Sequence, residues 1–180
     1  ISEGIVRCKS KGKIPVMYLQ LDGSVSHANL LIFNWKRNEI ERYEPHGGMV
    51  GYAEETNYLI NDYLKYEVVK GVNKKLNTDY EYVYNEMSRC GIQRPVETNI
   101  GDEKWVGVKG GFCQGISAYY LTLRLRYPYL SQKDIEKVVL KLLNSGNKNR
   151  LRNFILYTLQ YQDRFMKNIG LYEEFKKFVD

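Results

Sequence analysis

Residues 16–44 read VMYLQLDGSVSHANLLIFNWKRNEIERYE, and this stretch decides the fold. Its first part, Val16 to Leu21, predicts a short strand that ends at the turn signal Asp22-Gly23. An apolar run from Ala28 to Trp35 predicts a second strand, and a polar turn leads from it into a third strand over Glu39 to Glu44. We therefore expect a small antiparallel meander.

The remainder of the chain predicts one more strand and a series of helices. Alternating aromatic and polar residues mark the strand at Tyr80 to Tyr84, and a glycine-rich, loop-like stretch follows from Ser88 to Gly111. Capping residues and apolar periodicity predict helices that begin at Thr56, at Cys113 and at Ser131, and further helices over Arg150 to Ile169 and Leu171 to Val179. In the first helix, one broad face carries the apolar residues Leu59, Ile60, Tyr63 and Leu64. This order predicts an α+β fold, in which a small antiparallel or mixed sheet is flanked by helices.

Size and composition predict a single domain over residues 1–180. The chain has 180 residues, 43% of them hydrophobic, and can bury one core without a disulfide or a metal. Its three cysteines are an odd set without disulfide spacing, which favours a reducing, intracellular setting. No apolar run approaches the roughly 20 residues that cross a bilayer, so we expect no membrane partner. Because the chain begins at Ile1 and not at methionine, it is also expected to be a piece of a larger protein.

Several function classes lack the residues that they need. The net charge of +6 favours acidic partners, but no nucleic-acid-binding motif accompanies the spread basic residues, so nucleic acid is a secondary alternative. Two histidines and three dispersed cysteines form no Cys-x-x-Cys or His-x-x-x-His pair, which disfavours a zinc site. No phosphate-binding glycine loop and no Gly-x-Ser-x-Gly motif occurs. We therefore expect neither a metal nor a cofactor.

Cys113 is the strongest candidate for chemistry. It opens a predicted helix, and a helix N-terminus lowers the pKa of a thiol and makes it a better nucleophile. The preceding glycines, Gly110 and Gly111, allow backbone N–H groups to approach a substrate carbonyl. The alternative is a buried cysteine that packs at the start of a helix.

His27 and Glu44 can complete a catalytic group with Cys113. If the hairpin turns around Lys36 and Arg37, the numbers of paired residues add up to about 72 or 73, so His27 and Glu44 are near partners. A carboxylate in that position can hold an imidazole in one tautomer and stabilise its cation. The alternative is that His27 lies in a loop and that Glu44 is a solvated strand end.

These residues resemble the adenain-like cysteine proteases, a clan that also holds the proteases of SUMO and ubiquitin-like proteins. The resemblance rests on SHANLLIF at residues 26–33, IERYEPHG at residues 40–47 and GGFC at residues 110–113, in the order histidine, acid, cysteine. It covers roughly residues 16–127 and implies the adenain-like fold. The sequence departs from the clan at Ala28, where an aromatic residue is usual, and in the absence of a glutamine just before the cysteine.

The resemblance implies a protease in which Cys113 is the nucleophile, His27 the base and Glu44 the residue that orients the histidine. Gln93, or alternatively Gln114, would help to bind the oxyanion. The implied activity is hydrolysis of peptide or isopeptide bonds, first of all removal of ubiquitin or a ubiquitin-like modifier. The alternatives are a viral maturation protease that cleaves polyprotein substrates, an acetyltransferase, and a catalytically inert binding module. A source in a large DNA virus, and a location in the host cytoplasm or the virion, are expected with it.

Overall fold

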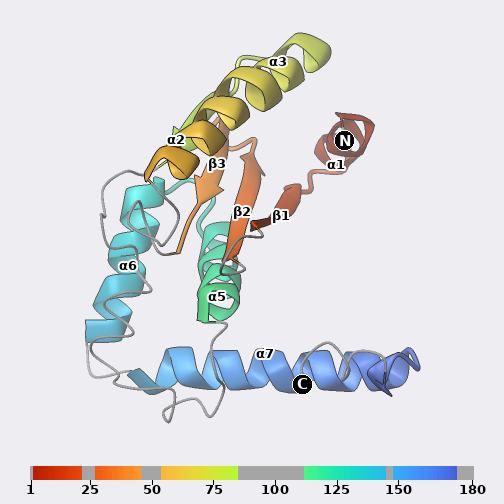
Figure 1. Ribbon diagram of the computed structural model, residues 1–180, viewed down its shortest axis with the longest axis vertical. Helices are drawn as coiled ribbons and strands as arrows, with labels where there is room; N and C mark the ends of the chain where they lie inside the picture. The colour runs from red at the N-terminus through yellow and green to blue at the C-terminus, as the bar shows by residue number, and fades with distance from the viewer. Residues whose placement is uncertain (1, 22–26, 46–53, 85–111, 145–147, 174–180) are drawn as a thin grey trace.

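The computed structural model describes residues 2–21, 27–45, 54–84, 112–144 and 148–173 (Figure 1). In chain order its elements are α1 (Ser2–Ser10), β1 (Val16–Leu21), β2 (His27–Asn34), β3 (Glu39–Tyr43), α2 (Glu54–Tyr63), the π-helix η1 (Leu64–Val69), α3 (Lys70–Leu76), β4 (Glu81–Tyr84), α5 (Phe112–Arg126), α6 (Gln132–Asn144) and α7 (Lys148–Asn168). None of the described helices combines the length and the apolar character that crossing a bilayer requires.

The sheet has the strand order β1-β2-β3-β4. β1, β2 and β3 pair antiparallel, as the meander predicts, whereas β4 pairs parallel to β3. A parallel neighbour requires a crossover connection, and α2, η1 and α3 supply it. The sheet is therefore mixed, and β2 and β3 are its two inner strands.

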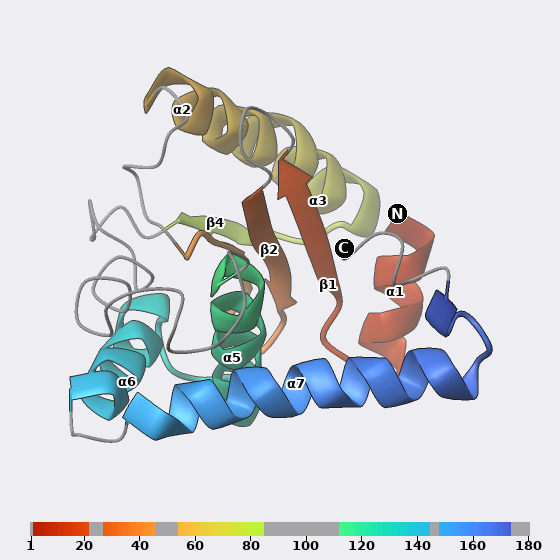
Figure 2. The same cartoon turned by 60° about the horizontal axis from the view of Figure 1, so that its bottom comes forward.

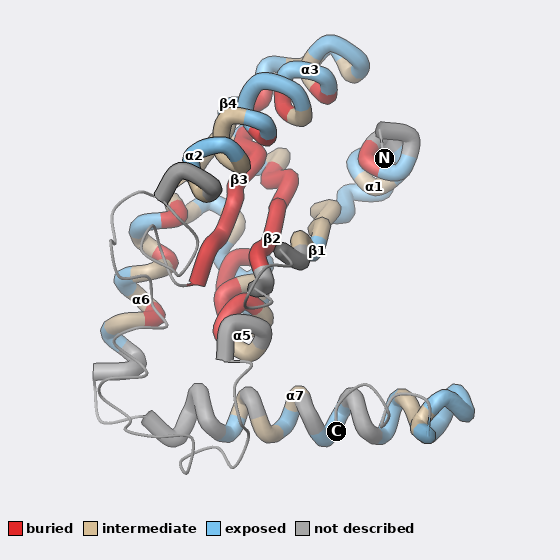
Figure 3. Tube along the Cα trace, viewed as in Figure 1, coloured by how far each residue is buried: buried red, intermediate tan, exposed pale blue. Residues whose placement is uncertain are grey.

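Helices cover both faces of the sheet, and successive residues of the inner strands therefore enter two different cores. Leu30 and Ile32 of β2 pack with residues of α5 and α6, such as Ile116 and Ile135. Leu31 and Phe33, the alternate residues, pack with α1, η1 and α3. Figures 1 and 2 show α2 and α3 on one side of the sheet and α5 and α7 on the other, and Figure 3 shows β3 and the described residues of β2 as buried.

The face toward α5 also contains a pair of stacked tyrosine rings. Tyr43 of β3 and Tyr120 of α5 lie parallel within 4°, with ring centroids 3.7 Å apart, and both residues are buried. Stacked aromatic pairs add about 0.5–1.5 kcal/mol to the energy of burial alone. This contact therefore fixes how α5 lies on the inner strands.

The turn between β2 and β3 holds the beginning of β4. Asn38 adopts a left-handed backbone conformation with φ of 58°, which asparagine tolerates better than most residues. Its side-chain amide donates to the Asp79 carboxylate at 2.8 Å, and its carbonyl accepts a hydrogen bond from the N–H of Glu81 at 2.9 Å. These hydrogen bonds from the hairpin turn thus fix where β4 begins after the crossover.

Several expectations differ from the structure in detail. α1 has no counterpart among the predicted elements, and the helix expected to start at Thr56 begins at Glu54. Of the apolar face predicted for that helix, Leu64 is buried, but Leu59 and Tyr63 are exposed. The helical segment packs on the sheet mainly through Leu64 and Val69 of η1, so some apolar residues of α2 remain outside the core.

Candidate functional site

The structure places three of the four predicted catalytic residues in the expected elements. Cys113 is the second residue of α5 and His27 is the first residue of β2, opposite Leu21 of β1. Glu44 directly follows β3 and is buried, not a solvated strand end. Gln93 lies outside the described residues, as do the side chains of His27 and Cys113. Their grouping into one site stays a prediction.

The β2–β3 register bears on the pairing of His27 with Glu44. Leu30 pairs with Tyr43 and Leu31 with Arg42, which confirms the hairpin register expected from the turn. Continued past the strand end, this register sets Glu44 opposite Asn29, two residues from His27. The Glu44 carboxylate forms an ion pair with Arg42, with Nη2 and Oε2 3.8 Å apart.

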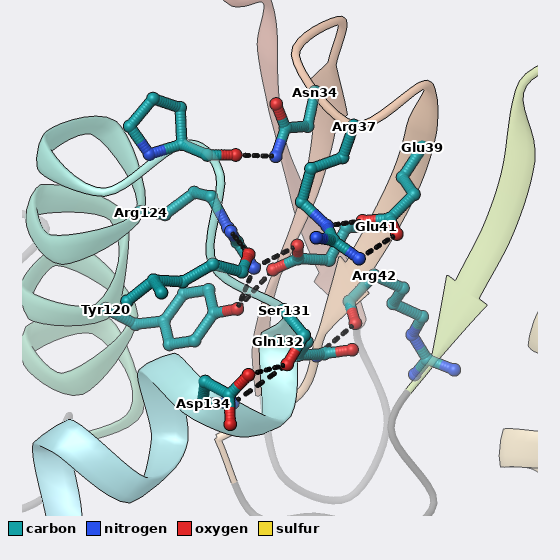
Figure 4. Close-up of polar contacts among 12 residues, drawn as sticks. Asn34, Arg37, Glu39, Glu41, Arg42, Tyr120, Arg124, Ser131, Gln132 and Asp134 are labelled. Atoms are coloured by element: carbon teal, nitrogen blue, oxygen red, sulfur yellow. Dashed lines mark hydrogen bonds and ion pairs between the residues drawn. The ribbon is translucent and has the colours of Figure 1, made fainter.

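β3 carries a buried carboxylate, Glu41, toward α5. Glu41 Oε2 lies 2.6 Å from Arg124 Nη2, and the hydroxyl of Tyr120 donates to Glu41 Oε1. Arg124 also donates to the Tyr120 hydroxyl at 3.3 Å and to the Leu130 carbonyl. We call Glu41, Tyr120 and Arg124 the Glu41 cluster; Figure 4 shows the three side chains converging between β3 and α5.

Burial dominates the electrostatics of the Glu41 cluster. Desolvation raises the pKa of the Glu41 carboxyl above its ordinary value, although Arg124 and the Tyr120 hydroxyl act in the opposite direction. Desolvation also raises the pKa of the Tyr120 hydroxyl, and the Glu41 charge adds to this effect. Tyr120 therefore stays a hydrogen-bond donor at all ordinary pH values.

The next residue of β3, Arg42, points to the opposite face of the sheet (Figure 4). Its Nε donates to Asn29 Oδ1 and its Nη1 to Asn61 Oδ1, both at 2.9 Å, and its guanidinium lies over the Tyr84 ring, 5.0 Å from the centroid. The Tyr82 hydroxyl donates to the same Asn61 oxygen at 2.7 Å. The Arg42 cluster, made of Asn29, Arg42, Glu44 and Asn61, thus joins β2, β3 and α2.

These two clusters act as internal supports. Their charged side chains are fully or almost fully buried, and each forms ion pairs with other side chains of the same chain. Among the described residues, no group of three histidine, cysteine, aspartate or glutamate side chains could hold a metal ion. The clusters therefore connect strands and helices, and in the described part of the chain they present no reactive group to solvent.

Sequence reasoning missed both clusters, although a signal was present. Glu41 and Arg42 lie within a predicted strand, and in a half-exposed sheet one of two neighbouring residues would face water. The strand predicted at Tyr80 to Tyr84 is separated from this strand by a predicted helix. Such an order is typical of a crossover connection whose helix covers the other face of the sheet. Had the parallel β4 been predicted, the burial of both charges would have followed.

Exposed aromatic side chains, by contrast, gather on two helices. On α7 and just after it, Tyr157, Tyr161, Phe165 and Ile169 repeat every four residues and are 62, 59, 50 and 47% exposed. Four-residue steps drift by about 40° on a helix, so the four side chains form one stripe about 18 Å long. We call these four residues the α7 stripe.

The second group lies on α2 and η1 and comprises Tyr58, Leu59, Tyr63 and Tyr66, all more than half exposed. Leu59, Tyr63 and Tyr66 follow the spacing of one helix face, and Tyr58 flanks them. Lys65 lies beside Tyr66, with its Nζ 5.1 Å from the ring centroid. We call these four apolar residues the α2 patch.

The two aromatic surfaces differ in the charge of their helices. α7 contains five basic residues and one acidic residue, among them the exposed Arg164 and Lys167. α2 and η1 together contain four acidic residues and one basic residue, among them the exposed Glu67. An apolar surface of this kind, rimmed by charge, is typical of a protein-binding face.

Comparison with known proteins finds a relative in a giant virus. A putative ankyrin repeat protein of Acanthamoeba polyphaga mimivirus is 26% identical over 157 residues, which cover 82% of this chain and 20% of that protein. The chain thus spans about a fifth of the relative's length. No family model matches the sequence, and no solved structure matches the fold.

This finding corrects the function expected from the sequence. The relative is described as an ankyrin repeat protein, not as a protease, so the assignment to the adenain-like and ubiquitin-like-protein protease clan is wrong. The same finding overturns the cysteine protease activity, with its deubiquitinase and maturation-protease versions. Short motifs around one histidine, one glutamate and one cysteine recur by chance, and the resemblance had little residue identity beyond them. Without a matching solved structure, the adenain-like fold stays a prediction.

Proposed function

We propose that this chain is a protein-binding module that contacts its partner through the α7 stripe. The observation that carries the proposal is the exposure of three aromatic rings and an isoleucine in one stripe along α7 and its end. Single exposed apolar residues are ordinary, but a continuous stripe of them is not, because contact with water is unfavourable for each apolar side chain. Tyrosine, which forms half of the stripe, is enriched in protein interfaces.

The first turns of α7 indicate what the stripe is for. Phe154, on the same side of α7, packs edge-on against Tyr119 of α5, with ring centroids 5.1 Å apart. Tyr161 and Phe165 lie about two and three turns further along this side and are exposed. The same helix face thus binds the body of the protein at its beginning and offers aromatic rings to a partner beyond it.

The mimivirus relative supports a binding role. Ankyrin repeats are stacks of helix pairs that build extended binding surfaces. The described elements of this chain form a mixed sheet and not such a stack, so we infer a separate module with its own surface. Of the partners expected from the sequence, a ubiquitin-like modifier and a polyprotein segment enter as protein ligands to be assayed. The viral relative supports a location of this chain in the host cytoplasm or the virion.

Site-specific photocrosslinking tests this function. A benzophenone amino acid replaces Tyr161 in one variant and Tyr129, which is 67% exposed and outside the stripe, in a matched control. We expect discrete protein adducts from position 161, absent from position 129 and lost when Phe165→Ser is added. Equal adducts from both positions, or none from position 161, would contradict the proposal. Binding to anionic vesicles with the same dependence on Phe165 would instead assign the stripe to a membrane surface.

A further inference from the structure

We infer that the α7 stripe of one copy docks on the α2 patch of a second copy of this chain. The inference rests on the proposed binding function and names a partner for the same stripe. Both surfaces consist of exposed side chains at helical spacing, and such faces pack by interdigitating their ridges and grooves. Each would thereby remove from water the aromatic rings that the single copy leaves exposed.

Charge selects this pairing over others. Over the length of the stripe, residues 157–169 contain two basic residues, Arg164 and Lys167, against one acidic residue, whereas α2 and η1 have four acidic residues against one basic residue. Two α7 helices facing each other would bring like charges together, and so would two α2 helices. Stripe against patch combines the apolar contact with opposite charge. The lysines of α3, which follows η1, mark the end of the acidic stretch and limit where α7 can lie.

The position of the two surfaces determines the kind of assembly. Figures 1 and 2 both show α2 and α7 on opposite sides of the sheet. A stripe therefore cannot reach the patch of its own copy, and the contact between two copies leaves one stripe and one patch unused. Such a head-to-tail contact continues into a ring or an open chain and does not stop at a symmetric dimer. Because the stripe is short, we expect weak association that depends on concentration.

Two blocked variants test the inference directly. Tyr161→Ser with Phe165→Ser removes the stripe, and Leu59→Ser with Tyr63→Ser removes the patch. We expect the unaltered chain to form species larger than a dimer in sedimentation velocity, and each variant alone to stay monomeric, with association weakened roughly tenfold or more. An equimolar mixture of the two should form a one-to-one dimer and nothing larger, because one intact stripe meets one intact patch.

Other outcomes overturn the inference in distinct ways. If the patch-blocked variant alone forms a dimer, α7 pairs with α7. If the unaltered chain is monomeric throughout while position 161 still crosslinks to another protein, self-association is wrong and the binding function stands. If raised salt does not weaken the assembly, the charge argument is wrong. Circular dichroism and thermal unfolding of each variant confirm that the substitutions leave the fold intact.

Discussion

The middle of the sheet and the two outer helices distribute their side chains in opposite ways. β3 buries Glu41 and Arg42, which are charged, whereas α2 and α7 expose aromatic rings. Folded proteins ordinarily do the reverse. The comparison teaches that each exception has its own reason: a buried charge persists where internal partners compensate its desolvation, and an exposed aromatic line persists where a surface has a binding role.

Removing one partner of the buried pair tests this comparison most severely. Arg124→Met leaves the Glu41 carboxylate in a dry core without its cation, and we expect the free energy of unfolding to fall by about 3–5 kcal/mol. Urea denaturation measures it. Lys137→Met is the matched control, because Lys137 pairs with Asp134 at the surface, and it should change the free energy of unfolding little. Equal losses in the two variants would show that burial of the pair has no special weight.

Arg42→Met tests the cluster on the other face of the sheet. The substitution removes the Arg42 donor from the Asn29 side-chain oxygen and leaves the Asn61 side-chain oxygen with the Tyr82 hydroxyl alone of its two donors. We expect a loss of about 2–3 kcal/mol, smaller than for Arg124, because the Arg42–Glu44 contact is longer. A free energy of unfolding within about 0.5 kcal/mol of the unaltered protein would show that Arg42 does not stabilise the contact between β3 and α2.

Glu41→Gln sharpens the comparison through pH. Burial raises the pKa of Glu41, so the folded protein favours the neutral carboxyl. The contribution of Glu41 to folding stability is therefore present below its unfolded pKa and is lost as pH rises through its folded pKa. A glutamine still offers an oxygen to Tyr120 and Arg124 but has no charge to desolvate. We therefore expect a change within about 1 kcal/mol that shifts in favour of glutamine between about pH 4 and pH 8. A shift in favour of glutamate, measured by denaturation at both pH values, would mean that Arg124 outweighs burial.

The smallest effect on stability is expected at the exposed rings. Tyr161→Ser and Phe165→Ser should each change the free energy of unfolding by no more than about 0.5 kcal/mol, since both side chains are at least half exposed. Phe165→Ser should nevertheless abolish crosslinking from position 161, and the two substitutions together should abolish self-association. Thermal unfolding beside the binding assays checks both statements. A large loss of stability would place the stripe in the fold and not in an interface.

Local patterns in the sequence predicted much of the sheet. The strand at Val16 to Leu21 is confirmed residue for residue, and the second and third strands are confirmed within one residue at each end. Each is an apolar or alternating run between turn residues, so its signal is contained in a few neighbours. The start of α6 is confirmed in the same way, because the Ser131 hydroxyl accepts a hydrogen bond from the N–H of Asp134.

The parts that sequence reasoning missed depend on contacts between distant residues. Nothing near Glu41 indicates that Arg124, far along the chain, supplies its countercharge. Likewise, Leu59 and Tyr63 have the spacing of a core-facing helix, and only the placement of η1 on the sheet leaves them exposed. The assignment to the protease clan was wrong for a related reason, whereas the grouping of Cys113, His27 and Glu44 into one site stays a prediction. Residue types in the right order do not establish a reaction without the geometry that brings them together.

The stacked rings of Tyr43 and Tyr120 supply a spectroscopic signal for the interior. Two aromatic chromophores held parallel in a dry, asymmetric setting contribute to near-ultraviolet circular dichroism, whereas freely rotating surface tyrosines contribute little. Because one ring belongs to β3 and the other to α5, this signal depends on the contact between helix and sheet. A state that keeps its helices but has lost this packing would retain the far-ultraviolet spectrum and lose the near-ultraviolet one. The protein can therefore report, without a label, whether its two layers are still in register.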